Sequence, residues 1–257
     1  MNDHRLLTPE REEKILDLLR ETTVLTVAEL SDTLGVSPAT IRRDLQSMHE
    51  RKLLERVRGG ATLRRMTRVE PLFHDKQSQN TAAKQAIATA ALKLVEDHDR
   101  IYLDGGSTIL MLARLLEARH DLTVVTNSLM AAAELMTCEH LLILVGGEFR
   151  ALSRTLVGPL TTPVVQSVHV DKAFMGTIGF TLKDGMTTTD PSEAFTKERV
   201  MERANQVILL ADSSKLGVPS FTRSGVIEDV DVLVTDAIDN SLKKELESLG
   251  IEVIVAD

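Results

Sequence analysis

The chain has 257 residues, which is enough for two domains with a core each, and it carries a formal net charge of −8. It has one cysteine, Cys138, no run of 18 apolar residues, no signal-peptide pattern at its N-terminus, and histidines without metal-ligand spacing. This composition excludes an intramolecular disulfide and predicts a cytoplasmic protein that neither crosses a membrane nor holds a metal or another cofactor.

The first predicted elements are two short helices joined by a tight turn. Thr26 and Glu29 have the spacing of a capping box, so they open a helix that Gly35 is expected to end. Ser37 is a good N-cap for the next helix, and Pro38 suits its first position. The pattern therefore predicts a helix-turn-helix.

The second of these helices has two different faces. Ile41, Leu45 and Met48 recur at the spacing of one buried stripe. The residues expected to contact DNA lie at the start of the helix and on its opposite face: Ser37, Ala39, Thr40, Arg42, Arg43 and Gln46.

A basic hairpin is predicted next, over residues 53–65, where two β-prone runs flank a pair of glycines. Its arms and tip carry Arg56, Arg58, Arg64 and Arg65. Such a hairpin is typical of the wing of a DNA-binding domain, and its expected DNA contacts are Arg56, Arg58, Gly59 and Gly60.

The charge distribution agrees with a single DNA-binding module. Residues 42–68 contain nine Lys or Arg against three Asp or Glu, a local charge of +6, which leaves −14 for the rest of the chain. A protein that is acidic overall but basic in its first quarter is expected to contact DNA with one module rather than to coat nucleic acid indiscriminately.

Residues 8–65 resemble the winged helix-turn-helix of the DeoR family of bacterial transcription regulators. The resemblance is carried by S-P-x-T-I-R-R-D-L from residue 37 and by the basic hairpin ending in G-G-A. It implies that residues 1–65 bind double-stranded operator DNA. The alternative for the second helix alone is an ordinary amphipathic helix with solvated arginines.

A linker is expected at 66–80, which has a proline, mixed charge and no periodicity, and a second domain at 81–257. A helical stripe opens that domain, and apolar runs then alternate with helical patterns. The runs are 101–103, 122–126, 141–145, 207–211, 232–235 and 252–256. This alternation predicts an α/β fold with a mostly parallel sheet covered by helices on both faces.

Polar turns follow four of these predicted strands, at 104–108, 127–128, 146–147 and 212–215. Ligands of such sheets bind at the carboxyl ends of the strands. A glycine and hydroxyl turn at a helix N-terminus also offers backbone N–H groups to a phosphate, and Lys215 could supply a counter-charge. Each turn taken singly could equally be ordinary turn chemistry.

The same turns resemble, in order, the motifs of the DeoR-family sensor domain, whose fold is shared with ribose-5-phosphate isomerase and acyl-CoA transferases. The motifs are L-D-x-G-[ST]-T near 103–108, T-N at 126–127, G-G at 146–147, D-K-x-F-M-G at 171–176 and A-D-S-S-K at 211–215. Position 98 is His where many relatives have Gly, in a turn expected to need a positive φ.

The resemblance implies that a phosphorylated sugar or sugar alcohol is the effector. The residues that it assigns to binding are Asp104, Gly105, Gly106, Ser107, Thr108, Thr126, Asn127, Gly147, Asp190, Glu193, Lys197 and Lys215. For Asp190, Glu193 and Lys197, a solvated helix start with Asp190 as its cap is an equally good interpretation.

The main alternative is a sugar-phosphate isomerase-like enzyme fused to a DNA-binding module. Ribose-5-phosphate isomerases carry acidic residues in a loop after a strand, whereas the comparable stretch here, 175–179, has no carboxylate to move a proton. An architectural DNA binder without a ligand leaves the polar turns unexplained. We therefore expect that the protein is not an enzyme. We expect a ligand-controlled transcription regulator that represses a carbohydrate-catabolism operon. It should act as a homo-oligomer on a two-fold operator.

Overall fold

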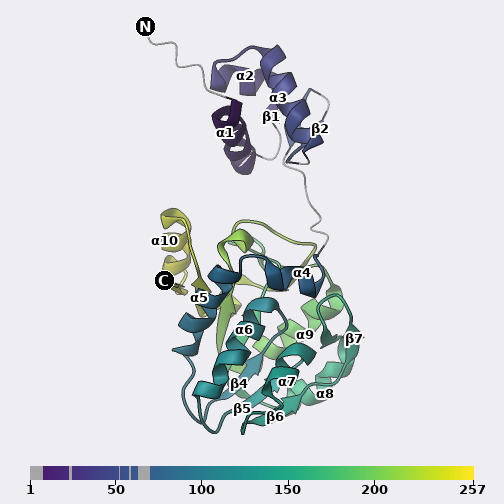
Figure 1. Ribbon diagram of the computed structural model, residues 1–257, viewed down its shortest axis with the longest axis vertical. Coiled ribbons are helices and arrows are strands. Elements are labelled where there is room, and N and C mark those ends of the chain that lie inside the picture. Colours follow the sequence, from purple (N-terminus) through teal and green to yellow (C-terminus); the bar gives the residue numbers. More distant parts are fainter. Residues whose placement is uncertain (1–7, 23–24, 52, 58, 63–69) are drawn as a thin grey trace. The chain divides into compact units, whose positions relative to one another are not determined.

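The computed structural model describes residues 8–22, 25–51, 53–57, 59–62 and 70–257. The chain divides into two compact units, Met1–Met66 and Thr67–Asp257 (Figure 1). Arg58, Arg64 and Arg65 of the predicted wing lie outside the described residues. No helix within those residues has the length and apolar character needed to span a bilayer.

The first unit contains the predicted winged helix-turn-helix. Its elements are α1 (Thr8–Glu21), β1 (Leu25–Thr26), α2 (Val27–Leu34), α3 (Pro38–Glu50), β2 (Glu55–Val57) and β3 (Gly60–Thr62). The predicted caps are confirmed: Glu29 N donates to Thr26 Oγ1 at 3.2 Å, Thr26 N donates to Glu29 Oε2 at 2.7 Å, and Gly35 ends α2 with a φ of 65°. The stripe of Ile41, Leu45 and Met48 is fully buried against α1 and α2.

The second unit is built on a seven-stranded, all-parallel sheet in the order β15-β14-β12-β9-β4-β5-β6. The strands are β4 (Arg100–Leu103), β5 (Thr123–Thr126), β6 (Leu141–Leu144), β9 (Val170–Gly176), β12 (Ala204–Leu210), β14 (Val232–Thr235) and β15 (Glu252–Val255). Six of them were predicted as strands. The central strand β9 was not predicted, because residues 171–176 were interpreted only as a family motif.

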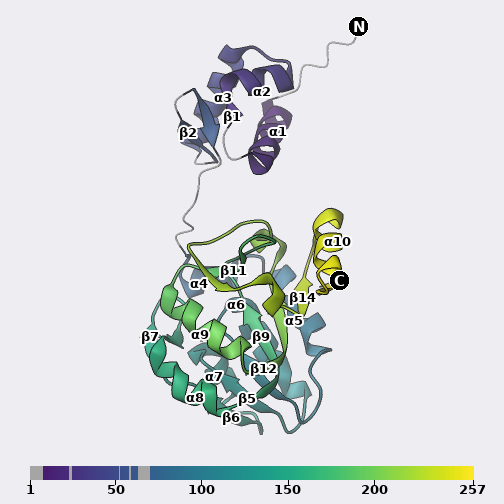
Figure 2. The ribbon, with the colours of Figure 1, turned by 180° about the vertical axis from the view of Figure 1, so that it is seen from behind.

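Helices cover both faces of this sheet, as predicted. One face packs α5 (Thr81–Leu92), α6 (Ser107–Leu115) and α7 (Leu129–Leu135), seen in Figure 1, and the other packs α8 (Thr162–Ser167), α9 (Pro191–Met201) and α10 (Asn240–Ser248), seen in Figure 2. Alternate residues of one strand serve the two layers: Ile101 and Leu103 pack on the first, and Tyr102 packs on the second. The α/β fold class is therefore confirmed.

The order of the strands places a crevice between β4 and β9. From β4 the chain moves outward through β5 and β6, then returns to β9 on the other side of β4 and moves outward again through β12. At such a reversal the connections leave in opposite directions, which opens a space beyond the carboxyl ends of the strands. Asp104, Gly176 and Asp212 stand at or directly after those ends.

Smaller elements complete the second unit. They are α4 (Phe73–Ser78), the hairpin of β7 (Glu148–Arg150) and β8 (Thr155–Val157), the antiparallel sheet of β10 (Gly179–Thr181), β11 (Gly185–Thr188) and β13 (Thr222–Gly225), and the 3-10 turns η1 (Leu116–Ala118), η2 (Pro159–Thr161), η3 (Ser213–Lys215) and η4 (Ile227–Asp229). The range 66–80, predicted as a linker, thus contains a helix in its described part, and both Glu70 and Phe73 are buried there. His98 has a φ of 68°, as its turn required.

Candidate functional site

The face of α3 predicted to meet DNA is exposed. Ala39, Arg42, Arg43 and Gln46 are all exposed, opposite the buried stripe. Ser37 acts as the N-cap: Thr40 N donates to Ser37 Oγ at 3.2 Å, and the two hydroxyl oxygens lie 2.9 Å apart. This exposed face presents two guanidinium groups that can reach base edges or phosphates in a groove.

A buried ion pair, which the sequence reading missed, ties α3 to α1. Arg11 Nε donates to Asp44 Oδ2 at 2.6 Å, and Arg11 Nη2 donates to Asp44 Oδ1 at 3.0 Å. Both side chains are under one-tenth exposed. The bidentate pair sets the angle of α3 within the unit, so Asp44 in the R-R-D-L motif has an internal structural role.

The wing is tied to the same helix by a chain of side-chain hydrogen bonds. Arg56 Nη1 donates to Gln46 Oε1 at 2.6 Å, and Gln46 Nε2 donates to Glu50 Oε1 at 2.7 Å. Gly59 is exposed with a φ of 87°, whereas Gly60 is buried so tightly that a Cβ there would lie 2.1 Å from Leu25 O. Gly60 is one of the predicted DNA contacts. In the structure it is buried where β3 packs against β1.

In the second unit a pocket lies at the carboxyl ends of β4, β9 and β12, on the predicted edge of the sheet. One wall is the stretch 105–108 at the start of α6, and another is formed by α4 and α5 through Lys76, Gln79, Asn80 and Lys84. The remaining lining comes from Ile109, from Ser153, from the ends of β9 and β12 with the residues that follow them, from α9 and from η3.

The start of α6 has the geometry of an anion site. Gly106 is the N-cap with a φ of 135°, and no side chain caps the helix. Ser107 and Thr108 occupy its first two positions and line the pocket. Because the first N–H groups of a helix lack internal partners, they and the helix dipole favour a negatively charged group. Gly105 is required for packing, since a Cβ there would lie 2.2 Å from Thr155 Cγ2.

Four lysines line the same pocket: Lys76, Lys84, Lys197 and Lys215. Lys84 is 4% exposed, and its Nζ donates to the carbonyl oxygens of Lys76 and Gln79, the latter at 2.6 Å. Burial lowers the pKa of Lys84; Asp212 opposes this change, and the charges of Lys215 and Lys76 add to it. An anionic ligand would offset this crowding of positive charge.

The floor of the pocket is a buried ion pair between β4 and α9. Lys197 Nζ donates to Asp104 Oδ2 and, at 2.9 Å, to Gly176 O, while Gly176 N donates to Asp104 Oδ2 at 2.9 Å. Burial opposes the charge on Lys197, but Asp104 and Glu193 raise its pKa. Lys197 therefore keeps its positive charge in this buried position.

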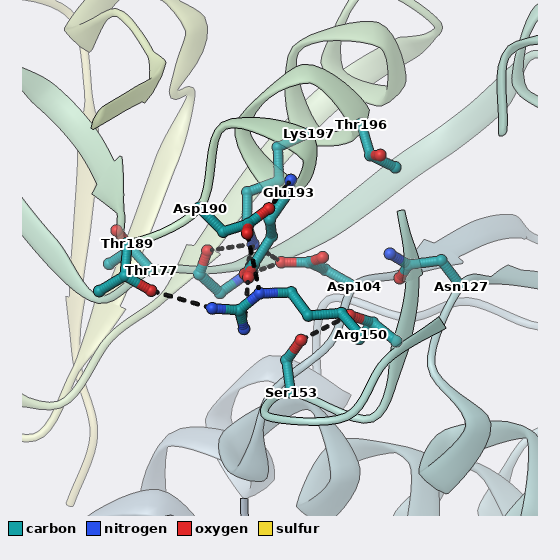
Figure 3. A network of polar contacts seen from close by, with 12 residues as sticks. Asp104, Asn127, Arg150, Ser153, Thr177, Thr189, Asp190, Glu193, Thr196 and Lys197 are labelled. Carbon is teal, nitrogen blue, oxygen red and sulfur yellow. Dashed lines mark hydrogen bonds and ion pairs between the residues drawn. The ribbon is translucent and has the colours of Figure 1, made fainter. Parts of the chain in front are cut away.

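Beside this pair, Arg150 of β7 joins three carboxylates, of which those of Asp190 and Glu193 are labelled in Figure 3. Its Nη2 donates to Glu70 Oε2 at 2.7 Å, its Nε lies 3.4 Å from Asp190 Oδ2, and its Nη1 lies 3.2 Å from Glu193 Oε2. Burial would raise the pKa of Glu70, but the hydrogen bond from Arg150 and the charge of Lys76 lower it to about 2. Burial raises the pKa of Glu193.

The structure brings together seven of the residues predicted to bind the effector. Gly105, Gly106, Ser107, Thr108, Glu193, Lys197 and Lys215 line the pocket. Asp104 lies directly behind Lys197 and orients it. Carboxylate, ammonium, hydroxyl and backbone N–H groups thus converge from three separate segments of the chain, 104–108, 193–197 and 215.

The other predicted effector residues have internal roles. Thr126 Oγ1 donates to Leu103 O at 2.6 Å, and Asn127 Nδ2 donates to Leu156 O at 3.1 Å, both in buried positions. Gly147 packs against β8, where a Cβ would lie 3.0 Å from Val157 N. Asp190 caps α9 by accepting from Glu193 N at 2.9 Å, which agrees with the alternative interpretation of a helix cap.

Several pocket residues were not predicted. Lys76, Gln79 and Asn80 come from the range read as a linker, Lys84 follows on α5, and Glu70 and Arg150 complete the buried network. Isolated polar residues in a stretch without periodicity carry no signal of this kind. Among the residues that the structure describes, no three His, Cys, Asp or Glu side chains are grouped to hold a metal ion.

Both units match family models. Residues 11–67 match the DeoR-like helix-turn-helix domain, and residues 79–237 match the DeoR C-terminal sensor domain. The chain is 35% identical over 250 residues to the HTH-type transcriptional regulator GlpR of Haloferax volcanii, covering 97% of this chain and 98% of that protein.

Two further similarities are to another named regulator and to a solved structure. The putative aga operon transcriptional repressor of Escherichia coli O157:H7 is 33% identical over 252 residues, covering 96% of this chain and 94% of that protein. A ribose 5-phosphate isomerase from Methanocaldococcus jannaschii has a TM-score of 0.41 and 24% identity, covering 54% of this chain and 55% of that one. On the two family models and the relatives that match it end to end, the chain belongs to the DeoR family and is a DNA-binding transcriptional regulator.

Proposed function

We propose that this regulator is a repressor of a carbohydrate-catabolism operon and that its effector is a phosphorylated sugar or sugar alcohol bound in the pocket of the second unit. The observation that carries the proposal is the convergence of the uncapped N-terminus of α6 with a cluster of lysines. A relative named as an operon repressor, similar over nearly its full length, supports the repressor assignment.

The phosphate is assigned to the end of the pocket where α6 begins. Ser107 and Thr108 offer hydroxyl and backbone N–H donors there, and Lys84 and Lys215 line the same pocket. A phosphomonoester carries about −1.5 to −2 charges at pH 7, so helix dipole and ammonium groups act on it together.

The sugar hydroxyls are assigned to the polar groups on the remaining wall. Asn80 Nδ2 donates to Asp212 Oδ1 at 3.0 Å, and both side chains line the pocket with Gln79 and Thr177. The amide groups can donate to and accept from a polyol, and the carboxylate can accept from its hydroxyls. Glu193, held between Arg150 and Lys197, adds a carboxylate at the floor.

The same arrangement favours binding over catalysis. Proton transfer on a sugar phosphate requires a carboxylate that is available to the carbon-bound hydrogen. Asp104 is engaged by Lys197 and by Gly176 N, Glu193 lies between Arg150 and Lys197, and the pocket stretch around Thr177 and Ile178 carries no carboxylate. We propose that the protein does not isomerise its ligand.

On the DNA side, we assign base reading to Arg42 and Arg43 and phosphate contacts to Arg56 and to Arg58, which lies outside the described residues. A two-fold operator requires two DNA-binding units, so we propose a homo-oligomer that acts on DNA in the cytoplasm. Effector binding then changes the population of the arrangement that fits the operator.

A thermal-shift comparison tests the effector site. Phosphorylated hexoses, hexitols and amino sugars should include one that stabilises the protein by about 2.7 kcal/mol at a hundredfold excess over its Kd, and its unphosphorylated form should do little. Lys215→Ala should abolish the shift, while Lys244→Ala, on the exposed face of α10, should keep it. No shift with any phosphorylated compound would refute the assignment.

A further inference from the structure

The stretch 70–84 belongs to the pocket and also follows the DNA-binding unit directly in the sequence. It contributes Lys76, Gln79, Asn80 and Lys84 to the lining. Its helix α4 is fixed to the second unit by the buried ring of Phe73, whose N donates to Leu152 O at 3.1 Å. The pocket wall therefore includes the described part of the second unit that is nearest in sequence to the DNA-binding unit.

Glu70 is the polar anchor of this stretch. It accepts from Lys76 Nζ at 2.6 Å, from Arg150 Nη2 at 2.7 Å and from the hydroxyl of Thr189. Its side chain is 1% exposed. A buried carboxylate with these three donors holds its segment in one position. If it lost them, the free-energy cost of its desolvation would no longer be offset by hydrogen bonds and opposite charges.

Lys76 belongs to both the anchor and the pocket. Its ammonium is bonded to Glu70, and its side chain forms part of the pocket wall. A ligand phosphate would be a second acceptor for that ammonium, with nearly two negative charges against the single charge of Glu70. The stronger anion draws the ammonium toward the pocket.

We propose that Glu70 competes with the anionic group of the effector for Lys76, so that filling the pocket releases the anchor of the stretch leading to the DNA-binding unit. This inference rests on the proposed function, because it needs an anion in that pocket. It makes Glu70 a positioning residue that acts on DNA binding through Lys76 and α4. By linkage, DNA binding that favours the anchored form weakens effector binding by the same factor.

Hydrogen exchange on the full chain tests the inference, with inorganic phosphate as the probe. In the wild type, saturating phosphate should speed exchange of the backbone amides of residues 73–78 by about tenfold. In Glu70→Gln these amides should exchange fast without phosphate and change little when it is added. Removing the competitor should also tighten phosphate binding several-fold.

Asp190→Asn is the matched control. It removes a carboxylate that contacts the same arginine, it does not line the pocket, and asparagine caps a helix as well as aspartate does. Exchange over 73–78 should stay slow in this variant. Equal exchange in the two variants would overturn the inference, because general loss of negative charge would then explain the result.

Lys76→Met provides a second route if Glu70→Gln does not fold. It removes the ammonium for which the two anions compete, so exchange over 73–78 should already be fast and phosphate should no longer alter it. Phosphate that binds the wild type without changing this exchange refutes the anchor release and leaves the effector site standing. Phosphate that stabilises neither the wild type nor any variant refutes the effector site itself, and the release with it.

Discussion

The two units arrange their functional side chains in opposite ways. In the DNA-binding unit, Arg42 and Arg43 lie on one exposed face of α3. The helical period and the N-cap at Ser37, five and six residues before them, determine that position. In the sensor unit, Asp104 and Lys197 meet across 93 residues, and Glu70 and Thr189 meet across 119. A surface that reads DNA can thus be encoded locally, whereas a pocket that encloses a small ligand is assembled by the topology of the sheet.

The largest expected effect sharpens this contrast at the floor of the pocket. Lys197→Met leaves Asp104 buried without its counter-charge, which should lower the free energy of unfolding of the sensor unit by about 3–5 kcal/mol. Denaturant titration measures it. Lys243→Met, which breaks only the exposed pair with Glu247, should change stability by less than about 0.5 kcal/mol. Equal losses in the two variants would mean that the buried pair has no special weight.

The second effect concerns pH and the anchor of the sensor unit. The folded-state pKa of Glu70 is about 2, below its ordinary value, so its contribution is complete above the unfolded pKa and is lost as pH falls through the folded one. Between about pH 5 and pH 2, the wild type should lose about 3 kcal/mol more than Glu70→Gln. Urea unfolding at several pH values measures the difference, and parallel pH profiles would contradict it.

The third effect lies wholly in the DNA-binding unit. Arg43→Ala should weaken specific operator binding by about 1–3 kcal/mol if the guanidinium reads a base edge. Arg56→Ala should weaken specific and non-specific binding alike and reduce the salt dependence by about one phosphate contact. Gel shifts at several salt concentrations separate the two. Both variants should keep the effector-induced thermal shift; its loss would break the division between the units.

The last prediction is that the protein does not isomerise sugar phosphates. Incubation with aldose or ketose phosphates in deuterated water should give no protein-dependent exchange at C1 or C2 of the sugar, because Asp104 is held by Lys197. NMR detects such exchange even without net turnover. Exchange that disappears in Glu193→Gln would show that the pocket carries acid–base chemistry as well as binding.

The same contrast explains what the sequence could predict. The caps, the buried stripe of α3 and six strands each have a signal within a few consecutive residues, and the structure has them all. Strand β9 was missed because Asp171 and Lys172 interrupt its apolar run. These two charges pair with Arg100 and Asp99 at the start of the neighbouring strand, a partnership that only the sheet reveals.

The pocket was predicted where its residues follow strands or begin helices and, through the family resemblance, at Glu193 and Lys197. The stretch 105–108 and Lys215 carry such a signal. Lys76 and Arg150 do not. Both donate to the carboxylate of Glu70, which is 80 residues from Arg150 and lies in a stretch without periodicity. Conversely, Thr126 and Gly147 resemble ligand residues in sequence but are used for packing.

The contribution of residues 70–80 to the pocket wall bears on how chains of this kind can recombine. Because Lys76 and Asn80 lie upstream of α5, a recombination event that exchanged DNA-binding units at residue 81 would separate part of the pocket wall from the rest of the sensor unit. A crossover before Glu70 would keep pocket, anchor and α4 together. The segment that must be kept together for ligand binding therefore begins at Glu70. An exchange before that residue would give a regulator a new operator specificity without changing its ligand.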